Sequence, residues 1–394
     1  MTSPADFIHR WLAARPAQAW AAANIGWHLA DKALRMAVVL VVAAWTARYL
    51  GPEQFGVLNY AIALVSIFAV AAGLGQSGLV VRDLVRDEAQ APTILGTAVL
   101  LQAGAGLVFS GAAAAAIVLL QPGMPALQMA GVVLAAGLLF KATAVVKCWF
   151  EARVQTRYTV WVENAAVLLG AGLTLALILL EAPFAAFALA ILAEGVLAAA
   201  GLLWIYSRQS GMLRRWRPDP GYAKQLLQQG WPLMLSALAT MIYLRADQVM
   251  LGRMVGQEAV GIYSAAVRIG EAWLFLPTAI VATLFPWLAR SRALADAVFH
   301  QRLQAIFGGL GLLAYLAAPA ITIAAGPVMK LLFGEAYAEG SLALIVLAWC
   351  GVFASLSAAS GSWYLLEGLQ RMALFRNLLG VVVNIALNLV LIPR

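Results

Sequence analysis

Eleven apolar segments follow one another along this chain of 394 residues, each long enough to cross a lipid bilayer as a helix. Such a helix needs about 20 mostly apolar residues. Short polar, proline or glycine stretches separate the segments, which cover 24–47, 55–81, 94–120, 126–147, 160–180, 183–207, 228–251, 260–288, 303–326, 340–365 and 374–392. Only 11% of residues are charged, against about 25% in soluble domains. The sequence therefore predicts an all-α polytopic membrane protein.

The positive charge of the chain, formally +8, lies mostly on one side of the predicted membrane. With a cytoplasmic N-terminus, seventeen Lys and Arg residues fall on the cytoplasmic side. The outer side then holds Arg48, Arg245, Arg253, Lys330 and Arg394. Cytoplasmic loops are enriched in Lys and Arg, so the bias predicts this orientation. The basic charge is thereby explained as a topology signal, and membrane lipid rather than nucleic acid is the expected partner.

Two stretches of sequence repeat each other at a constant offset of 205 residues: "RYLGPEQFGVLNYA" (48–61) and "RMVGQEAVGIYSAA" (253–266). Each joins a span that runs outward to a span that returns. The matching pairs are Arg48 and Arg253, Gly51 and Gly256, Glu53 and Glu258, Gly56 and Gly261, and Ala61 and Ala266. The glycines suit a tight turn with unusual dihedral angles. The pattern predicts an internal duplication.

Duplication predicts two pseudo-symmetric six-helix bundles around a central cavity. An N-terminal interfacial segment covers 1–23, since "FIHRWLAARPAQAW" is amphipathic and lacks the apolar core of a signal peptide; a frayed tail is the alternative. The first lobe covers 24–207, an Arg-rich cytoplasmic linker 208–227, and the second lobe 228–394, which is one helix short. Transporters built from repeats bind their substrate between the lobes near the midplane.

The first span carries a polar stripe near its start. Asn24, His28, Asp31 and Arg35 fall on one helical face, with Lys32 beside them. A charge at the centre of a membrane helix costs about 2.5–3.5 kcal/mol. The second lobe builds the equivalent helix without charges, so the stripe is not needed for the fold. It indicates a functional role and a hydrated interior between the helices. The alternative is that these groups reach the cytoplasmic surface as flexible side chains.

The eighth span holds a shorter stripe with Arg268 and Glu271, and the first lobe has Ala and Ser at the equivalent positions. A cavity with a basic excess from Lys32, Arg35 and Arg268 favours an anionic substrate, for which phosphate or pyrophosphate is the natural partner of Arg. Glu194 lies in the middle of the sixth span. It is either a coupling-ion carboxylate or a protonated, hydrogen-bonded packing residue.

Three segments together resemble a known family: "AWTARYLGPEQFGVLNYAIAL", "LRADQVMLGRMVGQEAVGIYSAAVRIGEAW" and "NIALNLVLIPR". They are similar to Wzx-type oligosaccharide flippases of polysaccharide biosynthesis, in the multidrug/oligosaccharidyl-lipid/polysaccharide (MOP) exporter superfamily. The resemblance implies alternating access in a bacterial inner membrane. The cargo would be an undecaprenyl-pyrophosphate-linked oligosaccharide, carried to the periplasmic leaflet, with polymerase and glycosyltransferase partners in the pathway. Family members normally continue beyond the position of Arg394 with a further span.

The resemblance also implies roles for particular residues. Lys32, Arg35 and Arg268 would line the cavity, and Arg48 and Arg253 with their turn motifs would serve gating or structure. No cofactor is expected, although coupling to a proton or sodium gradient is. The candidate carboxylates for that coupling are Asp31, Glu194, Asp247 and Glu271.

Three alternatives stay open. A drug/cation antiporter of the same superfamily would favour an acidic cavity, whereas a lipid II flippase shares the cationic one. A membrane glycan polymerase or acyltransferase would need a large outer loop or a cluster of His, Asp and Glu. The histidines are only His9, His28 and His300, and Cys148 and Cys350 indicate neither a disulfide nor a thiol metal site. We therefore expect a transporter rather than an enzyme.

Overall fold

The computed structural model describes residues 16–210, 215–292, 296–367 and 369–392. Within these ranges the side chains of residues 16–34, 210, 286, 290, 292, 370, 371, 373 and 374 are not described. The described residues form helices and turns and no strand, which confirms the all-α prediction.

The first lobe contains one long bent helix and six helical segments after it. They are α2 (Pro16–Ala72), α3 (Ser77–Arg86), α4 (Ala91–Leu120), α5 (Pro125–Ala136), α6 (Val145–Ala152), α7 (Arg157–Leu179) and α8 (Phe184–Ser210). Short 3-10 helices occupy Glu88–Gln90 and Gly137–Ala144. The second 3-10 helix joins α5 to α6, so the predicted span 126–147 is helical with a tighter central stretch. Lys141 lies in that stretch and is exposed.

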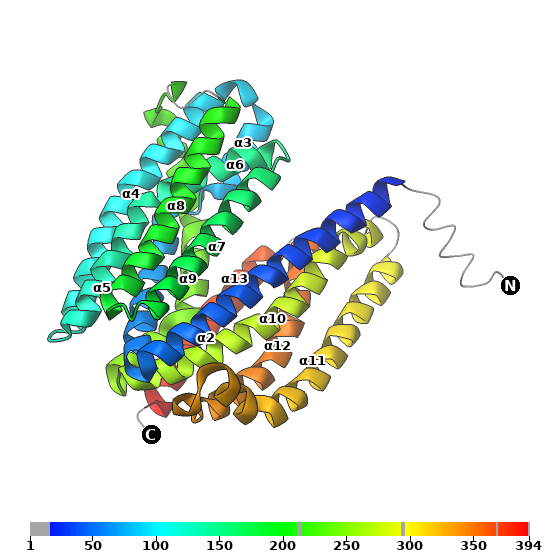
Figure 1. Ribbon diagram of the computed structural model, residues 1–394. Coiled ribbons are helices and arrows are strands. Elements are labelled where there is room, and N and C mark those ends of the chain that lie inside the picture. The colour runs from blue at the N-terminus through cyan, green and yellow to red at the C-terminus, as the bar shows by residue number, and fades with distance from the viewer. Residues whose placement is uncertain (1–15, 211–214, 293–295, 368, 393–394) are drawn as a thin grey trace.

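The second lobe is built from long helices. They are α9 (Pro220–Met254), α10 (Gln257–Arg292), α11 (Asp296–Phe333), the 3-10 helix Glu335–Tyr337, α12 (Gly340–Leu366) and α13 (Gln370–Leu391). Figure 1 shows two groups of helices that approach each other at one end and diverge at the other. The N-terminal arm of α2 lies beside α10 in the second group, and the start of α9 packs against Leu74 and Gly75 of the first lobe. We call the end where the two groups meet, which holds the turns at Gly51 and Gly256, the turn end. The opposite end, with α3 and the connection from α8 to α9, is the linker end.

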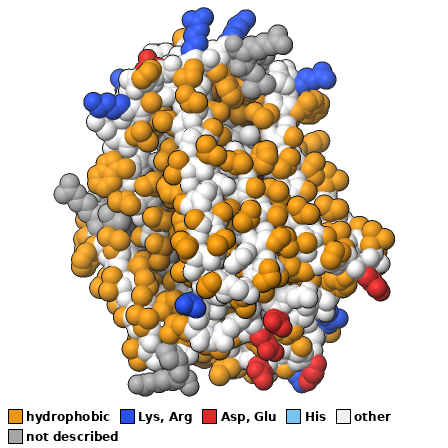
Figure 2. All heavy atoms as spheres, turned by 90° about the vertical axis from the view of Figure 1, so that its left-hand side faces the viewer, with side chains coloured by type: hydrophobic (Ala, Val, Ile, Leu, Met, Phe, Trp, Pro, Cys, Tyr) orange, Lys and Arg blue, Asp and Glu red, His pale blue; other side chains and the backbone are white. Residues whose placement is uncertain are grey.

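Eight helical segments of the described residues are long and apolar enough to cross a membrane. The first of them, 35–86, contains both arms of α2, which reverses direction at Gly51 (Figure 1). Large apolar side chains are exposed on the outside, for example Leu107 at 66%, Leu316 at 65% and Phe353 at 71%. Figure 2 shows apolar side chains over the middle of one face, with Lys and Arg at the linker end and most acidic groups at the turn end. The chain is a multi-pass membrane protein.

One predicted boundary is wrong. The segment 55–81 was expected to be a single span, but the second arm of α2 ends at Ala72. A turn follows in which Leu74 has φ 54° and Gly75 has φ 63°. The two glycines around Leu74 favour this left-handed turn, and α3 then starts at Ser77.

The two repeated motifs form turns, as predicted from their glycines. Gly51 has φ 73° and Gly256 has φ 135°, both in the region that glycine favours. Five residues further on, at Gly56 and Gly261, the motifs pack directly against each other. A Cβ on Gly56 would lie 1.7 Å from the carbonyl oxygen of Gln257, and a Cβ on Gly261 would lie 1.9 Å from that of Pro52.

These two contacts are equivalent under the repeat. The offset of 205 that relates Gly56 to Gly261 also relates Pro52 to Gln257. Contacts exchanged between copies in this way indicate twofold-type pseudo-symmetry. The duplication is therefore present in the packing as well as in the sequence, and the closest approach of the lobes is at the turn end.

At the linker end, glycine packing joins the turn before α3 to the start of α9, where a Cβ on Gly75 would lie 2.6 Å from the carbonyl oxygen of Gly230. Polar contacts add to this packing. The Trp216 indole donates to the Tyr206 hydroxyl at 3.2 Å, and the Asp219 amide donates to the Thr97 hydroxyl at 2.9 Å. The Tyr222 hydroxyl donates to Asp83 on α3 at 2.9 Å. Burial and the Asp83 carboxylate raise the pKa of Tyr222 above its ordinary value, so it stays a donor. These bonds hold residues 215–222 against the first lobe.

Candidate functional site

A cavity of about 340 Å³ lies between the lobes and is lined by α2, α7 and α10. Its lining residues are Arg35, Met36, Val39, Leu40, Val160, Glu163, Arg268, Glu271, Ala272 and Phe275. The sequence predicted that Arg35 and Arg268 face a common interior. The structure brings them to one cavity from different lobes.

Arg35 is held by α7. Its Nε donates to Oδ1 of Asn164 at 2.9 Å, and a terminal nitrogen also donates to that oxygen. The Nη1 atom lies 3.6 Å from Oε2 of Glu163. Asp31, four residues earlier on the same face of α2, has a side chain outside the described residues. The described partners of Arg35 come from α7.

Glu163 has a second cationic partner. Its Oε1 accepts from the ammonium group of Lys147 on α6. Both side chains are half-buried, with 33% of Lys147 and 27% of Glu163 exposed. The sequence placed Lys147 at the cytoplasmic end of the predicted span 126–147, and the structure places it in α6, where it pairs with the cavity residue Glu163.

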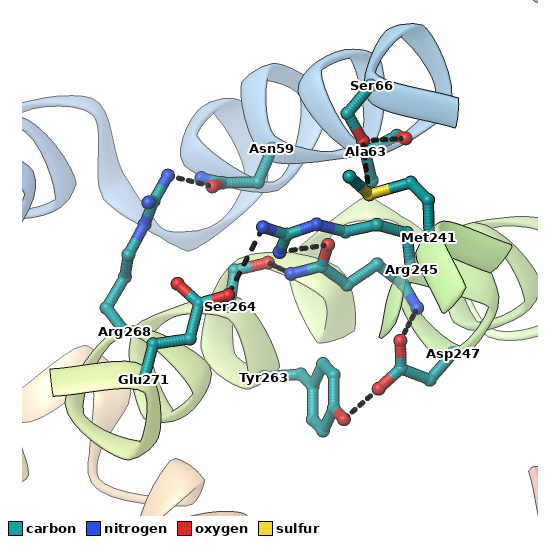
Figure 3. Close-up of polar contacts among 11 residues, drawn as sticks. Asn59, Ala63, Ser66, Met241, Arg245, Asp247, Tyr263, Ser264, Arg268 and Glu271 are labelled. Atoms are coloured by element: carbon teal, nitrogen blue, oxygen red, sulfur yellow. Dashed lines mark hydrogen bonds and ion pairs between the residues drawn. The ribbon is translucent and has the colours of Figure 1, made fainter. Parts of the chain in front are cut away.

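Arg268 lies on α10, eleven residues after that helix begins at Gln257. At 1.5 Å per residue this is about 16 Å from the turn end, near the middle of a membrane about 30 Å thick. One guanidinium nitrogen lies 3.5 Å from Oδ1 of Asn59 on the second arm of α2 (Figure 3). Asn59 is the repeat counterpart of Ser264. A polar residue of the first lobe thus faces the cavity arginine of the second.

Arg245 completes the polar wall of the second lobe. A terminal nitrogen lies 3.2 Å from Oε1 of Glu271, and Gln248 links the same guanidinium to the Ser264 hydroxyl through contacts of 3.5 and 3.2 Å (Figure 3). The sequence assigned Arg245 to the outer loops, and this assignment is wrong. Arg245 lies inside α9, nine residues before the helix ends at Met254, which places it about 13 Å from that end at the helical rise.

The other predicted carboxylates have separate environments. Asp247 accepts from the Tyr263 hydroxyl and from the backbone amide of Gln248, and does not line the cavity (Figure 3). Glu194 on α8 packs against Gly170 of α7, close enough to Arg35 for their charges to interact. Neither Asp247 nor Glu194 is among the residues that line the cavity, and Glu194 packs against α7, which forms part of the cavity wall.

Four predicted site residues, Asn24, His28, Asp31 and Lys32, lie on α2 with side chains outside the described residues. Their roles stay predictions.

The turn residues make contacts between the lobes. Arg48 donates to the carbonyl oxygens of Leu331 and Leu332 at the end of α11, the latter at 2.9 Å. Glu53, Arg253 and Glu258 are exposed at the surface of the turn end. A cation at a helix C-terminus satisfies free carbonyls and complements the helix dipole.

Sequence reasoning missed Lys147, Glu163, Asn164 and Arg245 as parts of the site. The available signal was polar sequence inside apolar helices, namely "VEN" one turn and a half into α7 and "RADQ" within α9. Their mutual pairing across helices could not be read from spacing along one helix.

The family described as "Polysaccharide biosynthesis protein" matches residues 21–292, more than half of the chain. No curated protein matches this chain. Among solved structures, an inward-facing multidrug resistance MATE family transporter of the MOP superfamily aligns with a TM-score of 0.65 at 17% identity, covering 91% of this chain and 94% of that one.

An outward-facing structure of a multidrug resistance MATE family transporter aligns with a TM-score of 0.54 at 16% identity, covering 92% of this chain and 95% of that one. A MOP superfamily transporter from Pyrococcus furiosus, described by the reverse polarity of its binding pocket, aligns with a TM-score of 0.53 at 14% identity, covering 92% of this chain and 95% of that one. These likenesses show that the chain shares the fold of MOP superfamily transporters. The chain belongs to the polysaccharide biosynthesis protein family and has the MOP transporter fold.

Proposed function

We propose that this protein carries an undecaprenyl-pyrophosphate-linked oligosaccharide from the cytoplasmic to the periplasmic leaflet of a bacterial inner membrane. The observation that carries the proposal is the meeting of Arg35 and Arg268, from different lobes, in one cavity. Arg presents a planar set of donors that matches phosphate oxygens. The family match to polysaccharide biosynthesis supports a glycan as the rest of the cargo.

The charge balance around the cavity favours an anion over a cationic drug. Two lining arginines, together with Lys147 and Arg245, face the two carboxylates Glu163 and Glu271. Among these six described side chains there is an excess of two positive charges. The Pyrococcus furiosus transporter is described as having a binding pocket of reverse polarity that suggests a different function, so pocket charge varies within this fold.

Packing supports an inward-open conformation and alternating access. The lobes are in backbone contact at the turn end. At the linker end, α10 to α12 diverge from α4 to α8 (Figure 1), while the start of α9 stays against the first lobe at Leu74 and Gly75. The inward-facing MATE structure also aligns better than the outward-facing one. With the Arg-rich linker end in the cytoplasm, the cavity would receive cargo from the cytoplasmic leaflet.

Transport in vesicles tests the proposal. We expect Arg35→Gln and Arg268→Gln each to lower the flipping of a fluorescent undecaprenyl-pyrophosphate sugar by roughly 10- to 100-fold, because hydrogen bonds to charged groups are lost. Lys330→Gln is the matched control, since that cation pairs with Glu335 outside the cavity. Equal flipping of a neutral sugar lipid, or wild-type rates in both arginine variants, would reject the function.

Cysteine labelling tests the orientation. In a chain with Cys148 and Cys350 replaced by Ser, we expect Glu53→Cys and Glu258→Cys to react with a membrane-impermeant maleimide in intact cells. Arg215→Cys should react only after the membrane is opened. All three native side chains are exposed. The reverse pattern would place the linker end outside and would invert the proposed direction of transport.

A further inference from the structure

In each lobe, one carboxylate that lines the cavity lies near two cations, which come from two different helices. The first lobe has Glu163 between Arg35 and Lys147, and the second has Glu271 next to both Arg245 and Arg268. The two sets share no repeat positions, because adding 205 to 35 or 147 does not lead to 245 or 268. Similar charge arrangements have therefore been built from different positions in the two lobes.

In the first-lobe set, the two oxygens of Glu163 face different partners. Oε1 accepts from Lys147, and Oε2 lies 3.6 Å from Arg35. Arg35 also donates to Asn164, which keeps its guanidinium at the cavity wall independently of Glu163. Removal of the Glu163 charge would consequently leave Arg35 in place.

In the second-lobe set, Glu271 is the more accessible partner. Its side chain is 43% exposed, against 22% for Arg245, and its Oε1 lies 3.2 Å from that guanidinium. Arg268 lies one helical turn away from Glu271 on α10, and the charges of the two interact. Gln248 and Asn59 provide neutral contacts to Arg245 and Arg268.

A site for an anion has a physical reason to contain carboxylates when it is empty. Unpaired cations away from bulk water carry a large desolvation penalty, which a nearby carboxylate offsets. A carboxylate and a phosphate also accept from Lys and Arg donors in similar geometry. Cargo phosphates and the two glutamates would therefore compete for the same cations.

We propose that Glu163 and Glu271 are resident counter-ions which the phosphates of the cargo displace, and that Lys147 and Arg245 thereby join Arg35 and Arg268 as phosphate ligands. This inference rests on the proposed function and deepens it. Displacement leaves each glutamate ready to recover its cations, which favours release of the cargo. The glutamates thus weaken binding and speed turnover.

Binding of inorganic pyrophosphate to the purified full chain in detergent, followed by calorimetry, tests the inference. We expect Glu163→Gln and Glu271→Gln each to tighten binding about tenfold, since a competing negative charge is removed. Lys147→Gln and Arg245→Gln should weaken it to a similar extent. The Lys330–Glu335 pair supplies matched controls, because it joins the same residue types at 2.7 Å outside the cavity. Lys330→Gln and Glu335→Gln should leave the affinity unchanged.

A combined variant separates charge competition from damage to the fold. Lys147→Gln with Glu163→Gln removes one charge of each sign and should return the pyrophosphate affinity close to wild type. If the single variants instead damaged the fold, their losses of affinity would add together in the double variant. Pyrophosphate binding that depends on Arg35 but is unchanged in both Glu→Gln variants overturns this inference alone. Absence of binding to the wild-type chain overturns it together with the proposed function.

Discussion

The two copies of the repeated turn have the same backbone packing but different side-chain contacts. Gly56 and Gly261 make equivalent contacts across the interface between the lobes. The carbonyl group before each motif arginine also accepts a bond from the other lobe. Ala47 accepts from the Tyr337 hydroxyl at 2.8 Å, and its counterpart Gly252 accepts from the Gln121 amide at 3.4 Å.

The arginines that follow differ more. Both are exposed, but Arg48 bonds to two carbonyls at the end of α11, and Arg253 makes no equivalent bond among the described residues. The fold therefore keeps the symmetry where backbones touch and loses it where long side chains reach the partner lobe. Arg48 accordingly contributes more than Arg253 to the contact between the lobes at the turn end.

The largest expected effect comes from breaking the symmetric part. Gly56→Ala and Gly261→Ala should each destabilise the protein by about 1–3 kcal/mol or more, because the new methyl group overlaps a backbone carbonyl. The melting temperature of the purified protein measures this. Gly104→Ala and Gly111→Ala on α4 are controls, since nothing lies within 4 Å of a Cβ there. A marked loss for only one of Gly56 and Gly261 would contradict the pseudo-symmetry.

An intermediate effect should separate the two carbonyl contacts. Tyr337 is 1% exposed, and Tyr337→Phe removes a buried hydrogen bond, for which we expect a loss of about 1 kcal/mol. Gln121→Leu, which removes the longer contact, should cost less. Thermal unfolding of the two variants side by side checks the order. An equal or larger loss for Gln121→Leu would show that the second contact is as strong as the first.

The smallest effect concerns the arginines. Arg48→Gln should lower stability by about 0.5–1.5 kcal/mol through its lost bonds to α11. Arg253→Gln should stay within about 0.5 kcal/mol, as for most surface substitutions. The same melting measurement applies, with maleimide labelling of a cysteine in the cavity wall from the outer side as a second readout. Equal behaviour of both variants would remove the asymmetry.

Much of the architecture could be predicted from local sequence. Apolar length predicted the helices, because a backbone in lipid must satisfy its hydrogen bonds within the helix. Gly51 and Gly256 marked the turns, since their positive φ angles exclude most other residues. The break at Ala72 was missed because the apolar pattern runs past it into α3.

Within the candidate site, the sequence pointed to Arg35, Arg268 and Glu271 because charges are costly inside apolar helices. It did not reveal that Glu163 and Asn164 hold Arg35, nor that Arg245 points inward to Glu271. These pairs join residues 129 and 128 positions apart for Arg35, or different helices of the second lobe for Arg245. Helical periodicity places a residue on a face of its own helix and says nothing of the opposing helix.

Hydropathy, the polar residues between spans and the dihedral preferences of glycine are local properties, so the amino-acid sequence is enough to predict a membrane protein with two repeated helical lobes. Which charges meet depends on the tertiary structure. The partners of a cavity arginine are set by the packing of α2 against α7 and α10, where atoms distant in sequence come within hydrogen-bonding distance. That packing joins two basic residues and one carboxylate in each lobe, the arrangement from which the proposed exchange of glutamate for phosphate follows.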